Sequence, residues 1–309
     1  MPHPYNQIDA IRCALIALVV IVHTVHFGHL HPDFKDAVNF FFMPAFLVVT
    51  GYLVRVDVSA SRFGLYLLRI AVPYVIMSVG FAALSLWLPV EGGLSECSVG
   101  GFADVLLLHP IGPYWYFHTM IVCGALYYVA HAACGRFGVA AEMCVFGALA
   151  TVVAFASPVL AFLYAASYFA GAALRRGGAD FAGVFPASAW AVAPFVLIIV
   201  LGREAGGGLA VAGLVASFFC FVAWVWGLLG GRAAEWVGYV GRNTLPIYLF
   251  HPIFTMMGKF AVPLFTWDPT GIAHMLFTLA LAIGGSLALA RALDATGLSR
   301  LFARKSLLR

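Results

Sequence analysis

Residues 8–27 read IDAIRCALIALVVIVHTVHF, and this stretch decides the fold class of the chain. The run is apolar and close to the length of about 20 residues that a helix needs to cross a bilayer. Two ionisable side chains interrupt it, Arg12 near its start and His23 near its end. At about 100° per residue, eleven residues of separation put both on one helix stripe, about 16 Å apart along the axis. Since ionisable groups inside a membrane helix are costly, each is a candidate functional residue.

The rest of the chain repeats this apolar character. Of its 309 residues, 63% are apolar and 10% are charged, against about 45–50% and 25% in soluble domains. The sequence therefore predicts an all-α, polytopic integral membrane bundle of about ten transmembrane helices, without an appended soluble domain. The expected spans are residues 8–27, 36–54, 65–88, 113–131, 138–156, 158–175, 187–202, 208–230, 243–263 and 271–291.

The basic residues indicate how these spans are oriented. If residue 1 is cytoplasmic, thirteen of the 17 Lys and Arg residues fall on the cytoplasmic side. The opposite side holds Lys35 and Arg203, with Lys259 late in the ninth span, and the external loop 89–112 carries no Lys or Arg. This positive-inside bias predicts that both termini are cytoplasmic. Because residues 1–7 contain no Lys or Arg, we expect the first span to be retained rather than cleaved as a signal peptide.

His23 is the strongest candidate for a catalytic base. An imidazole works as a base near neutral pH, and a cationic neighbour with burial would keep it neutral. A structural histidine is the alternative. The histidines that follow, His26, His29 and His31, are read as interfacial polar residues. A metal site is a further alternative, but no Cys or Glu completes a ligand shell, so no metal is expected.

The second span and the loop after it contain a possible packing surface and a basic cluster. The pair Thr50-Gly51 offers small residues against which another helix can pack. Arg55, Arg62 and Arg69 flank the short loop that follows, with enough positive charge to hold a phosphorylated cofactor. Ordinary positive-inside topology explains these arginines equally well.

Two later stretches carry polar and aromatic residues in apolar surroundings. In GPYWYFHTM, residues 112–120, Trp115 and Tyr116 belong either to an aromatic belt or to a carbohydrate-stacking surface, and a belt does not explain His118. In GRNTLPIYLFHPIF, residues 241–254, the polar side chains are Asn243, Thr244, Tyr248 and His251. Polar groups of this kind avoid lipid, which predicts a polar path or hydrogen bonds between helices.

Taken together, these motifs resemble the membrane-embedded acyltransferase-3 family, which includes fucose 4-O-acetylase-like proteins and O-antigen and peptidoglycan O-acetyltransferases. The resemblance rests on motifs in a fixed order along nearly the whole chain, and ten spans is the number found in that family. The motifs are IDAIR with Arg12 eleven residues before His23, the aromatic second span with Pro44 and Gly51-Tyr52, LLRIAVPY, YWYF, YFAGAALRR at 168–176, and G-x-N-T-L-x-I-Y-x-x-H-P at 241–252.

The resemblance implies that residues 1–309 form one transmembrane acyltransferase domain. It would move an acyl group, usually acetyl from acetyl-CoA, from the cytoplasmic side to a hydroxyl on the outer face. His23 would act as general base or carry the acyl group, and Arg12 would orient the donor or stabilise the thioester oxygen. Arg69, assisted by Arg62 or Arg55, would contact the cofactor's phosphates. Trp115, Tyr116, His118, Asn243, Tyr248 and His251 are then the candidate substrate-binding residues.

The resemblance implies the lipid bilayer as a partner and, as acceptor, a glycan or lipid-linked sugar of the cell envelope or a separate periplasmic protein. No nucleic-acid partner is expected. The short external loops and the charge bias fit a bacterial inner membrane. One departure concerns the basic loop. Some family members place two arginines three residues apart there, whereas Tyr66 and Val72 flank Arg69 at that distance. The competing hypothesis is a secondary transporter with a buried His/Arg path, although we find no internal repeat of the kind transporters show.

Overall fold

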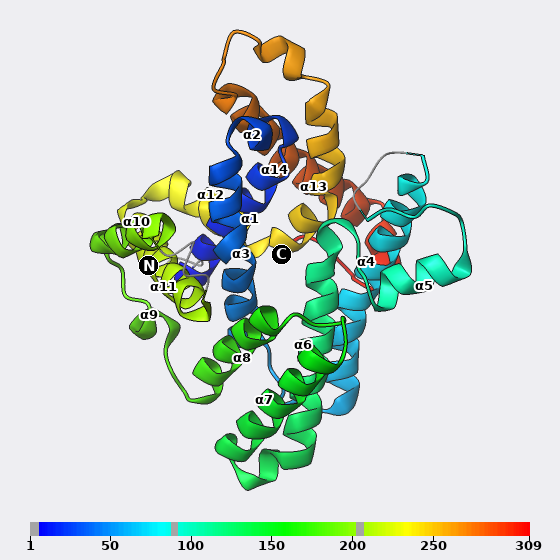
Figure 1. The fold of residues 1–309 in the computed structure, drawn as a ribbon, viewed down its shortest axis with the longest axis vertical. Helices are drawn as coiled ribbons and strands as arrows, with labels where there is room; N and C mark the ends of the chain where they lie inside the picture. Colours follow the sequence, from blue (N-terminus) through cyan, green and yellow to red (C-terminus); the bar gives the residue numbers. More distant parts are fainter. Residues whose placement is uncertain (1–5, 88–91, 202–206) are drawn as a thin grey trace. The chain divides into compact units, whose positions relative to one another are not determined.

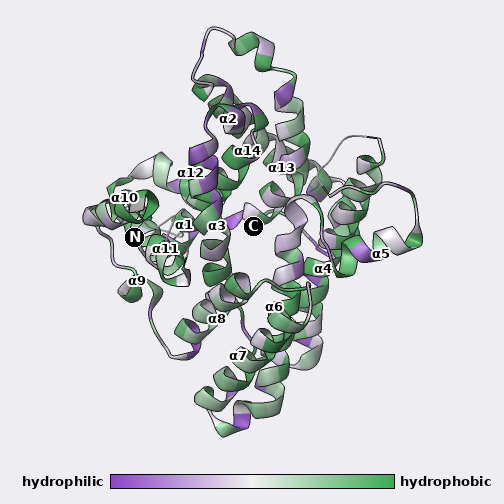
Figure 2. Cartoon of the chain, in the orientation of Figure 1, coloured by the Kyte–Doolittle hydropathy of each residue, from purple (hydrophilic) through white to green (hydrophobic). Residues whose placement is uncertain are grey.

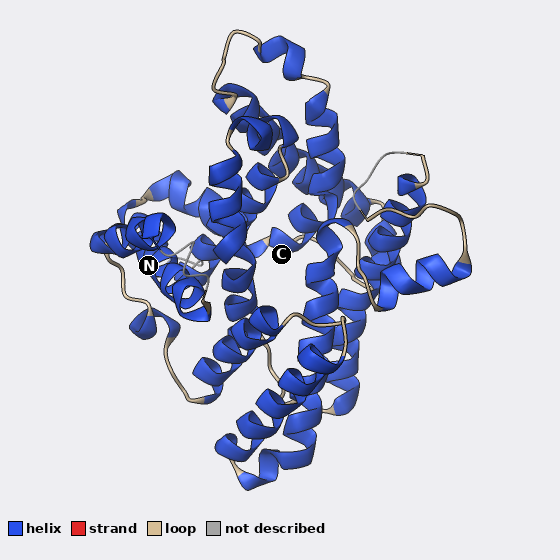
Figure 3. Ribbon diagram, viewed as in Figure 1, coloured by secondary structure: helices blue, strands red, loops and turns tan. Residues whose placement is uncertain are grey.

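The computed structural model describes residues 6–87, 92–201 and 207–309. Within these ranges the chain is built from α-helices and short 3-10 turns, and the described residues form no strand (Figure 3). This confirms the predicted all-α class. The longer helices, labelled in Figure 1, are α1 (Gln7–Val22), α3 (Pro32–Leu53), α4 (Ala60–Ser85), α6 (Trp115–Cys134), α7 (Val139–Ala156), α8 (Phe162–Arg176), α11 (Gly208–Leu228), α12 (Gly231–Arg242), α13 (Thr244–Lys259) and α14 (Ile272–Ala295). The shorter ones are α2 (Val25–Leu30), α5 (Val99–Leu107), α9 (Phe181–Val184), α10 (Val192–Leu201) and the 3-10 helix η5 (Leu298–Phe302).

Six segments in the described ranges are long and apolar enough to cross a membrane, which supports a multi-pass membrane protein. They are Pro32–Leu53, Ala60–Ser85, Gly112–Phe137, Val139–Ala156, Gly208–Leu228 and Ile272–Ala295. The predicted count of ten spans is not confirmed. The expected span 187–202, for example, contains only the ten-residue helix α10. Arg203 and Glu91, both predicted to be external, lie outside the described residues.

The first predicted span is not one continuous helix. Helix α1 ends at Val22, His23 forms its C-cap, and Thr24 takes an extended conformation (φ −80°, ψ 91°) before α2 begins. The buried Thr24 hydroxyl donates to the Val20 carbonyl at 3.0 Å. This side-chain bond competes with continued helix formation, as threonine bonds to the preceding turn often do. The expectation of a helix running to residue 27 is therefore wrong at its C-terminal end.

A second difference concerns residues 231–242, which the sequence treats as a connection. They form helix α12, with the motif glycine Gly241 near its end. A Cβ atom at Gly241 would overlap the Asp9 carbonyl of α1. The missing side chain therefore allows the backbones of α12 and α1 to approach closely.

Contacts divide the chain into two compact units. Unit 1 comprises Met1–Phe46, Asp180–Gly297 and Ser306–Arg309, and unit 2 comprises Leu47–Ala179 and Leu298–Lys305. In unit 1, α1 packs against α11, α12, α13 and α14. This grouping does not test the expectation that residues 1–309 form one transmembrane domain, which stays a prediction.

In unit 2 the C-terminal part of α3 packs closely against α8. A Cβ at Gly51 would overlap the Tyr168 carbonyl, and a Cβ at Gly171 would overlap the Val48 carbonyl. The packing role predicted for Thr50-Gly51 is thereby confirmed. Contact of backbone with backbone across small residues is the usual way in which membrane helices associate.

Large apolar side chains remain exposed on several helices, as lipid-facing surfaces require. On α10, Leu197 is 58% exposed and Val200 is 70% exposed. Figure 2 shows α10 and α11 mainly in the hydrophobic colour. Apolar patches of this kind on a monomer mark a surface that something apolar covers, and for this chain that is the bilayer.

Candidate functional site

Arg12 is held in unit 1 between α1 and the start of α13. Its Nη2 donates to the Thr244 hydroxyl at 2.6 Å, and its Nη1 lies 3.8 Å from the Asp9 carboxylate. Asp9 is only 7% exposed, and Arg242 also contacts it at 3.3 Å. The carboxylate thus compensates two guanidinium groups in partly buried surroundings, where an unpaired charge would be costly.

His23 lies at the break between α1 and α2. Its Nδ1 is 2.7 Å from the Val19 carbonyl oxygen. Because a carbonyl oxygen only accepts, Nδ1 carries the hydrogen in this contact and Nε2 carries the lone pair. The orientation that this bond imposes is the one a general base needs, with the basic nitrogen facing away from its own helix.

His251 on α13 is the neighbour of His23. The two ring centroids are 5.1 Å apart with an interplanar angle of 71°. His251 is fully buried, and its Nδ1 lies 2.9 Å from the Tyr248 carbonyl and 3.2 Å from the Ile247 carbonyl. Among the described residues, nothing forms a hydrogen bond with its buried Nε2. Both rings therefore direct Nδ1–H to the backbone, which leaves Nε2 of each ring as the nitrogen that can accept a proton.

The contacts also bear on the predicted stripe. Arg12 and His23 both face α13, where their partners Thr244 and His251 lie seven residues apart. One face of α1 thus meets one helix along its length, as the eleven-residue spacing implies. The stripe ends at the helix break, because His23 is the last residue with helical dihedrals.

The other polar residues predicted on α13 serve different contacts. Tyr248 is buried, with its ring 5.7 Å from that of His251. Asn243 connects α12 to α13, and its amide contacts backbone only: Nδ2 donates to the Tyr239 carbonyl at 2.9 Å and Oδ1 accepts from the Arg309 amide at 2.8 Å. The contacts of Asn243 are those of a structural cap.

Two other histidines of the N-terminal segment contact α14 or the residues just before it. His26 packs edge-on against His274, with centroids 5.2 Å apart, and His31 Nε2 lies 2.8 Å from the Thr270 carbonyl. His274 is buried and contacts the Gly258 carbonyl through Nε2 at 2.9 Å. In the described part of the chain, no three His, Cys, Asp or Glu side chains are placed to hold a metal ion.

The three candidate cofactor arginines lie in unit 2, and all are exposed. Only Arg69 lines the cavity described at this surface. That cavity holds about 550 Å³, and the residues around it are Arg69, Arg300, Ala303, Arg304 and Lys305. The structure therefore groups Arg69 with basic residues that follow α14, while Arg62 and Arg55 are not part of the lining.

The candidate aromatic surface is also in unit 2. The Trp115 ring stacks on Tyr164 at 4.6 Å, and the Tyr116 hydroxyl lies 2.6 Å from the Thr50 hydroxyl. His118 is 8% exposed and its Nε2 donates to the Leu107 carbonyl at 3.1 Å. This hydrogen bond joins α6 to α5, so His118 has a structural role here, which membership of an aromatic belt would not explain.

The comparison with known families decides the class. The sequence model of the acyltransferase-3 family, described as an acyltransferase domain, matches residues 5–291. The chain belongs to the acyltransferase-3 family. No curated protein and no solved structure matches it. The resemblance recognised from the motifs is confirmed, and the chain is a membrane acyltransferase.

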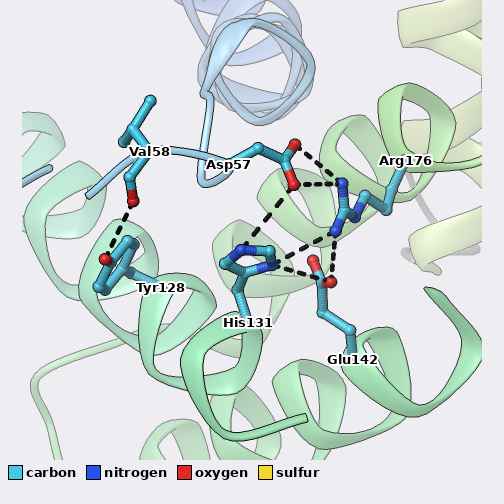
Figure 4. Close-up of polar contacts among 6 residues, drawn as sticks. All are labelled: Asp57, Val58, Tyr128, His131, Glu142 and Arg176. Atoms are coloured by element: carbon cyan, nitrogen blue, oxygen red, sulfur yellow. Dashed lines mark hydrogen bonds and ion pairs between the residues drawn. The ribbon is translucent and has the colours of Figure 1, made fainter. Parts of the chain in front are cut away.

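This acyltransferase contains one buried polar cluster that the motifs do not point to (Figure 4). Glu142 on α7 is fully buried, and its Oε2 accepts from Arg176 Nη2 at 2.7 Å and lies 3.0 Å from His131 Nδ1. Arg176 also contacts both carboxylate oxygens of Asp57 at 2.8 Å. The hydrogen bond that Arg176 donates to Glu142 raises the pKa of Arg176, so the guanidinium stays charged.

The cluster fastens the loop between α3 and α4 to the helices around it. Asp57 lies in that loop, and the next residue, Val58, accepts a hydrogen bond from the Tyr128 hydroxyl at 3.1 Å. One signal of this cluster is visible in the sequence, namely an acidic residue in an apolar span together with two arginines at a helix end. Their pairing across 34 residues is a tertiary contact that spacing alone does not reveal.

Proposed function

We propose that this membrane acyltransferase moves an acyl group, in the first instance acetyl, from cytoplasmic acyl-CoA to a sugar hydroxyl on the outer side. The acceptor would be a glycan or lipid-linked sugar of the cell envelope, and the membrane a bacterial inner membrane with both termini cytoplasmic. The observation that carries the proposal is the His23–His251 pair, with Arg12 held on the same face of α1, inside a domain of the acyltransferase-3 family.

The chemistry follows from the arrangement of the imidazoles. Nε2 of His23 takes the proton of the acceptor hydroxyl while its oxygen attacks the thioester carbon. The C–S bond breaks, CoA leaves as the thiol after receiving that proton, and the sugar ester remains. His251 lies edge-on to His23 with its own Nδ1 fixed by backbone. It therefore supports the orientation of the His23 ring and offers a second basic nitrogen.

The same residues also allow a two-step route. His23 Nε2 would attack the thioester carbon first, and the C–S bond would break to release CoA as the thiolate. The acyl group would then pass from His23 to the acceptor hydroxyl, whose proton neutralises the thiolate. Arg12 would orient the donor in either route, since its place about three helix turns from His23 puts the two side chains on different parts of the donor. Its contact with Thr244 limits the positions of the guanidinium, so the group that holds the acyl donor would already be oriented when the donor binds.

Four of the remaining predicted residues take binding roles in this proposal. Arg69 would contact the phosphates of the donor from the cavity that it lines. Trp115 and Tyr116 would stack on the acceptor sugar, with Tyr248 near the imidazole pair. A separate periplasmic protein is the alternative acceptor.

The test of the proposal is acyl transfer by the purified chain in proteoliposomes supplied with radiolabelled acetyl-CoA. We expect label to leave the thioester and appear as an alkali-labile ester on added envelope glycan or lipid-linked sugar. Succinyl-CoA supplied in parallel distinguishes acetyl from longer donors. Absence of both CoA binding and thioester cleavage would contradict the donor assignment.

A further inference from the structure

The segment after α14 forms a tight left-handed turn next to the cavity that Arg69 lines. In η5, the Ala303 amide donates to the Arg300 carbonyl at 3.0 Å and the Arg304 amide donates to the Ser299 carbonyl at 3.3 Å. These two bonds are those of a Schellman motif, with Ala303 at the left-handed position (φ 55°). Ala303 is the one non-glycine residue in the described ranges with a positive φ.

A left-handed alanine costs about 1–2 kcal/mol relative to its right-handed form. Glycine removes that cost and is the usual residue at this position. Buried anchors hold the turn nonetheless, because Phe302 is 8% exposed and Ser299 is fully buried. Strain of this kind persists where the surroundings fix it, and it gathers at ligand sites.

The turn brings three cationic side chains to one cavity. Arg300, Arg304 and Lys305 line it together with Arg69 from α4, and the fifth lining residue is Ala303. No carboxylate is among the five residues that line this cavity. Arg304 Nη2 also donates to the Arg69 carbonyl at 3.1 Å, which joins the segment to α4.

Four like charges around a space of about 550 Å³ repel one another, and an anion in that space would remove the repulsion. The volume lies within the range of about 300–1,000 Å³ that small-molecule sites occupy. Arginine predominates in the lining, and its planar fork of donors binds phosphate oxygens in pairs. The charge and the donor geometry therefore both indicate a phosphate-rich ligand.

We propose that Arg300, Arg304 and Lys305 complete with Arg69 a binding site for the phosphorylated nucleotide end of the acyl-CoA donor. The proposal rests on the proposed function, since it assigns a site to the donor named there. The 3′-phosphate and the diphosphate of CoA together carry about four negative charges, which the four cations match. An anionic phospholipid headgroup shares the phosphate chemistry but brings about one charge, so the nucleotide is the better match.

The experiment compares CoA with dephospho-CoA, which lacks the 3′-phosphate, by calorimetric titration of the purified chain in neutral detergent. The test variant is Arg300→Gln with Lys305→Gln. Both side chains are exposed. The control is Arg232→Gln with Arg291→Gln, which removes the same charge from exposed positions outside the cavity.

We expect wild type and the control to bind CoA about tenfold more tightly than dephospho-CoA, because hydrogen bonds to charged groups contribute about 1.5–3 kcal/mol. The test variant should bind CoA about 30-fold more weakly than wild type and lose the preference for the 3′-phosphate. CoA binding that is equal in the test and control variants would overturn the inference and leave the proposed donor intact. Absence of CoA binding to wild type would refute the donor itself and the inference with it.

A second arm separates the lipid source from the nucleotide source. The same titrations are run in nanodiscs of phosphatidylcholine alone and of phosphatidylcholine with phosphatidylglycerol. The nucleotide site predicts the same CoA preference in both, weakened only modestly by the anionic lipid. Loss of phosphatidylglycerol binding in the test variant, with CoA affinity unchanged, would assign the cavity to a lipid headgroup and overturn the proposal.

Discussion

Removing Arg176 should destabilise this acyltransferase strongly, and the reason is the buried Glu142 carboxylate. Glu142 is fully buried, whereas Asp57, the other carboxylate that Arg176 contacts, has a side chain 64% exposed. In Arg176→Met, Glu142 would keep only the His131 contact at 3.0 Å. Breaking a buried pair from one side costs about 3–5 kcal/mol, and the exposed pair with Asp57 adds at most about 1 kcal/mol.

The size of the effect can be checked by thermal denaturation in detergent. By the scaling of about 2–4 °C per kcal/mol for chains of 150–250 residues, Arg176→Met should lower Tm by about 10 °C. The exposed carboxylate provides the matched control, and Asp57→Asn should lower Tm by about 3 °C or less. The double variant Glu142→Gln with Arg176→Met removes the stranded charge and should recover at least half of the loss.

Together with the single variant Glu142→Gln, Arg176→Met and the double variant form a double-mutant cycle, which isolates the coupling between Glu142 and Arg176. We expect a coupling free energy of about 2 kcal/mol or more. The reasoning would be refuted by a Tm of Arg176→Met within about 2 °C of wild type. A double variant no more stable than Arg176→Met would equally show that the buried charge is not the cause.

Two further perturbations test the packing and the site. Gly51→Ala should lower Tm by several degrees, because its Cβ would overlap the Tyr168 carbonyl and overpacking costs about 1–3 kcal/mol. Gly64→Ala is the control, since its Cβ meets nothing within 4 Å. This control should leave Tm unchanged or slightly higher. Equal melting of the two alanine variants would contradict the close approach of α3 and α8. Thr244→Val removes the acceptor of the 2.6 Å bond from Arg12 and should slow acyl transfer about tenfold with little change in Tm. An unchanged transfer rate would show that the position of Arg12 does not matter to the reaction.

The helical class and the family could be predicted because both depend on local patterns. Apolar runs of membrane length report helices directly, and the family motifs keep their order along the chain. The packing role of Gly51 was also predictable, since small residues in membrane helices usually face a neighbour. What these features share is that a short stretch of sequence contains the whole signal.

The break at His23–Thr24 could not be predicted in the same way. The sequence stays apolar through residue 27, so nothing in it marks the end of α1 at Val22 or the extended backbone that Thr24 adopts before α2. Helix α12 was not predicted, because its charged residues and glycines are typical of a connection between spans. The structure shows that these residues form a helix that packs against α1.

Contacts between residues far apart in the sequence could be predicted least. His251 was predicted as a polar residue, but its position beside His23 joins parts of the chain 228 residues apart. Arg300, Arg304 and Lys305 were read only as charges that set orientation, since nothing in the sequence indicates that they share a cavity with Arg69. The loop lacks a second arginine three residues from Arg69, where Tyr66 and Val72 stand instead. This absence does not indicate which other basic residues lie near Arg69.

We propose that His23 carries the chemistry of acyl transfer, and the transfer rate of a His23 variant tests this role. The rate of acyl transfer from labelled acetyl-CoA is compared for wild type, His23→Ala and His29→Ala in proteoliposomes, with Tm and CoA affinity recorded for each. His29 is exposed and serves as the matched histidine control. The account predicts a loss of about 10²–10⁴-fold for His23→Ala at unchanged Tm and CoA affinity, with His29→Ala near wild type. Transfer by a folded, CoA-binding His23→Ala variant at a rate close to wild type would contradict it.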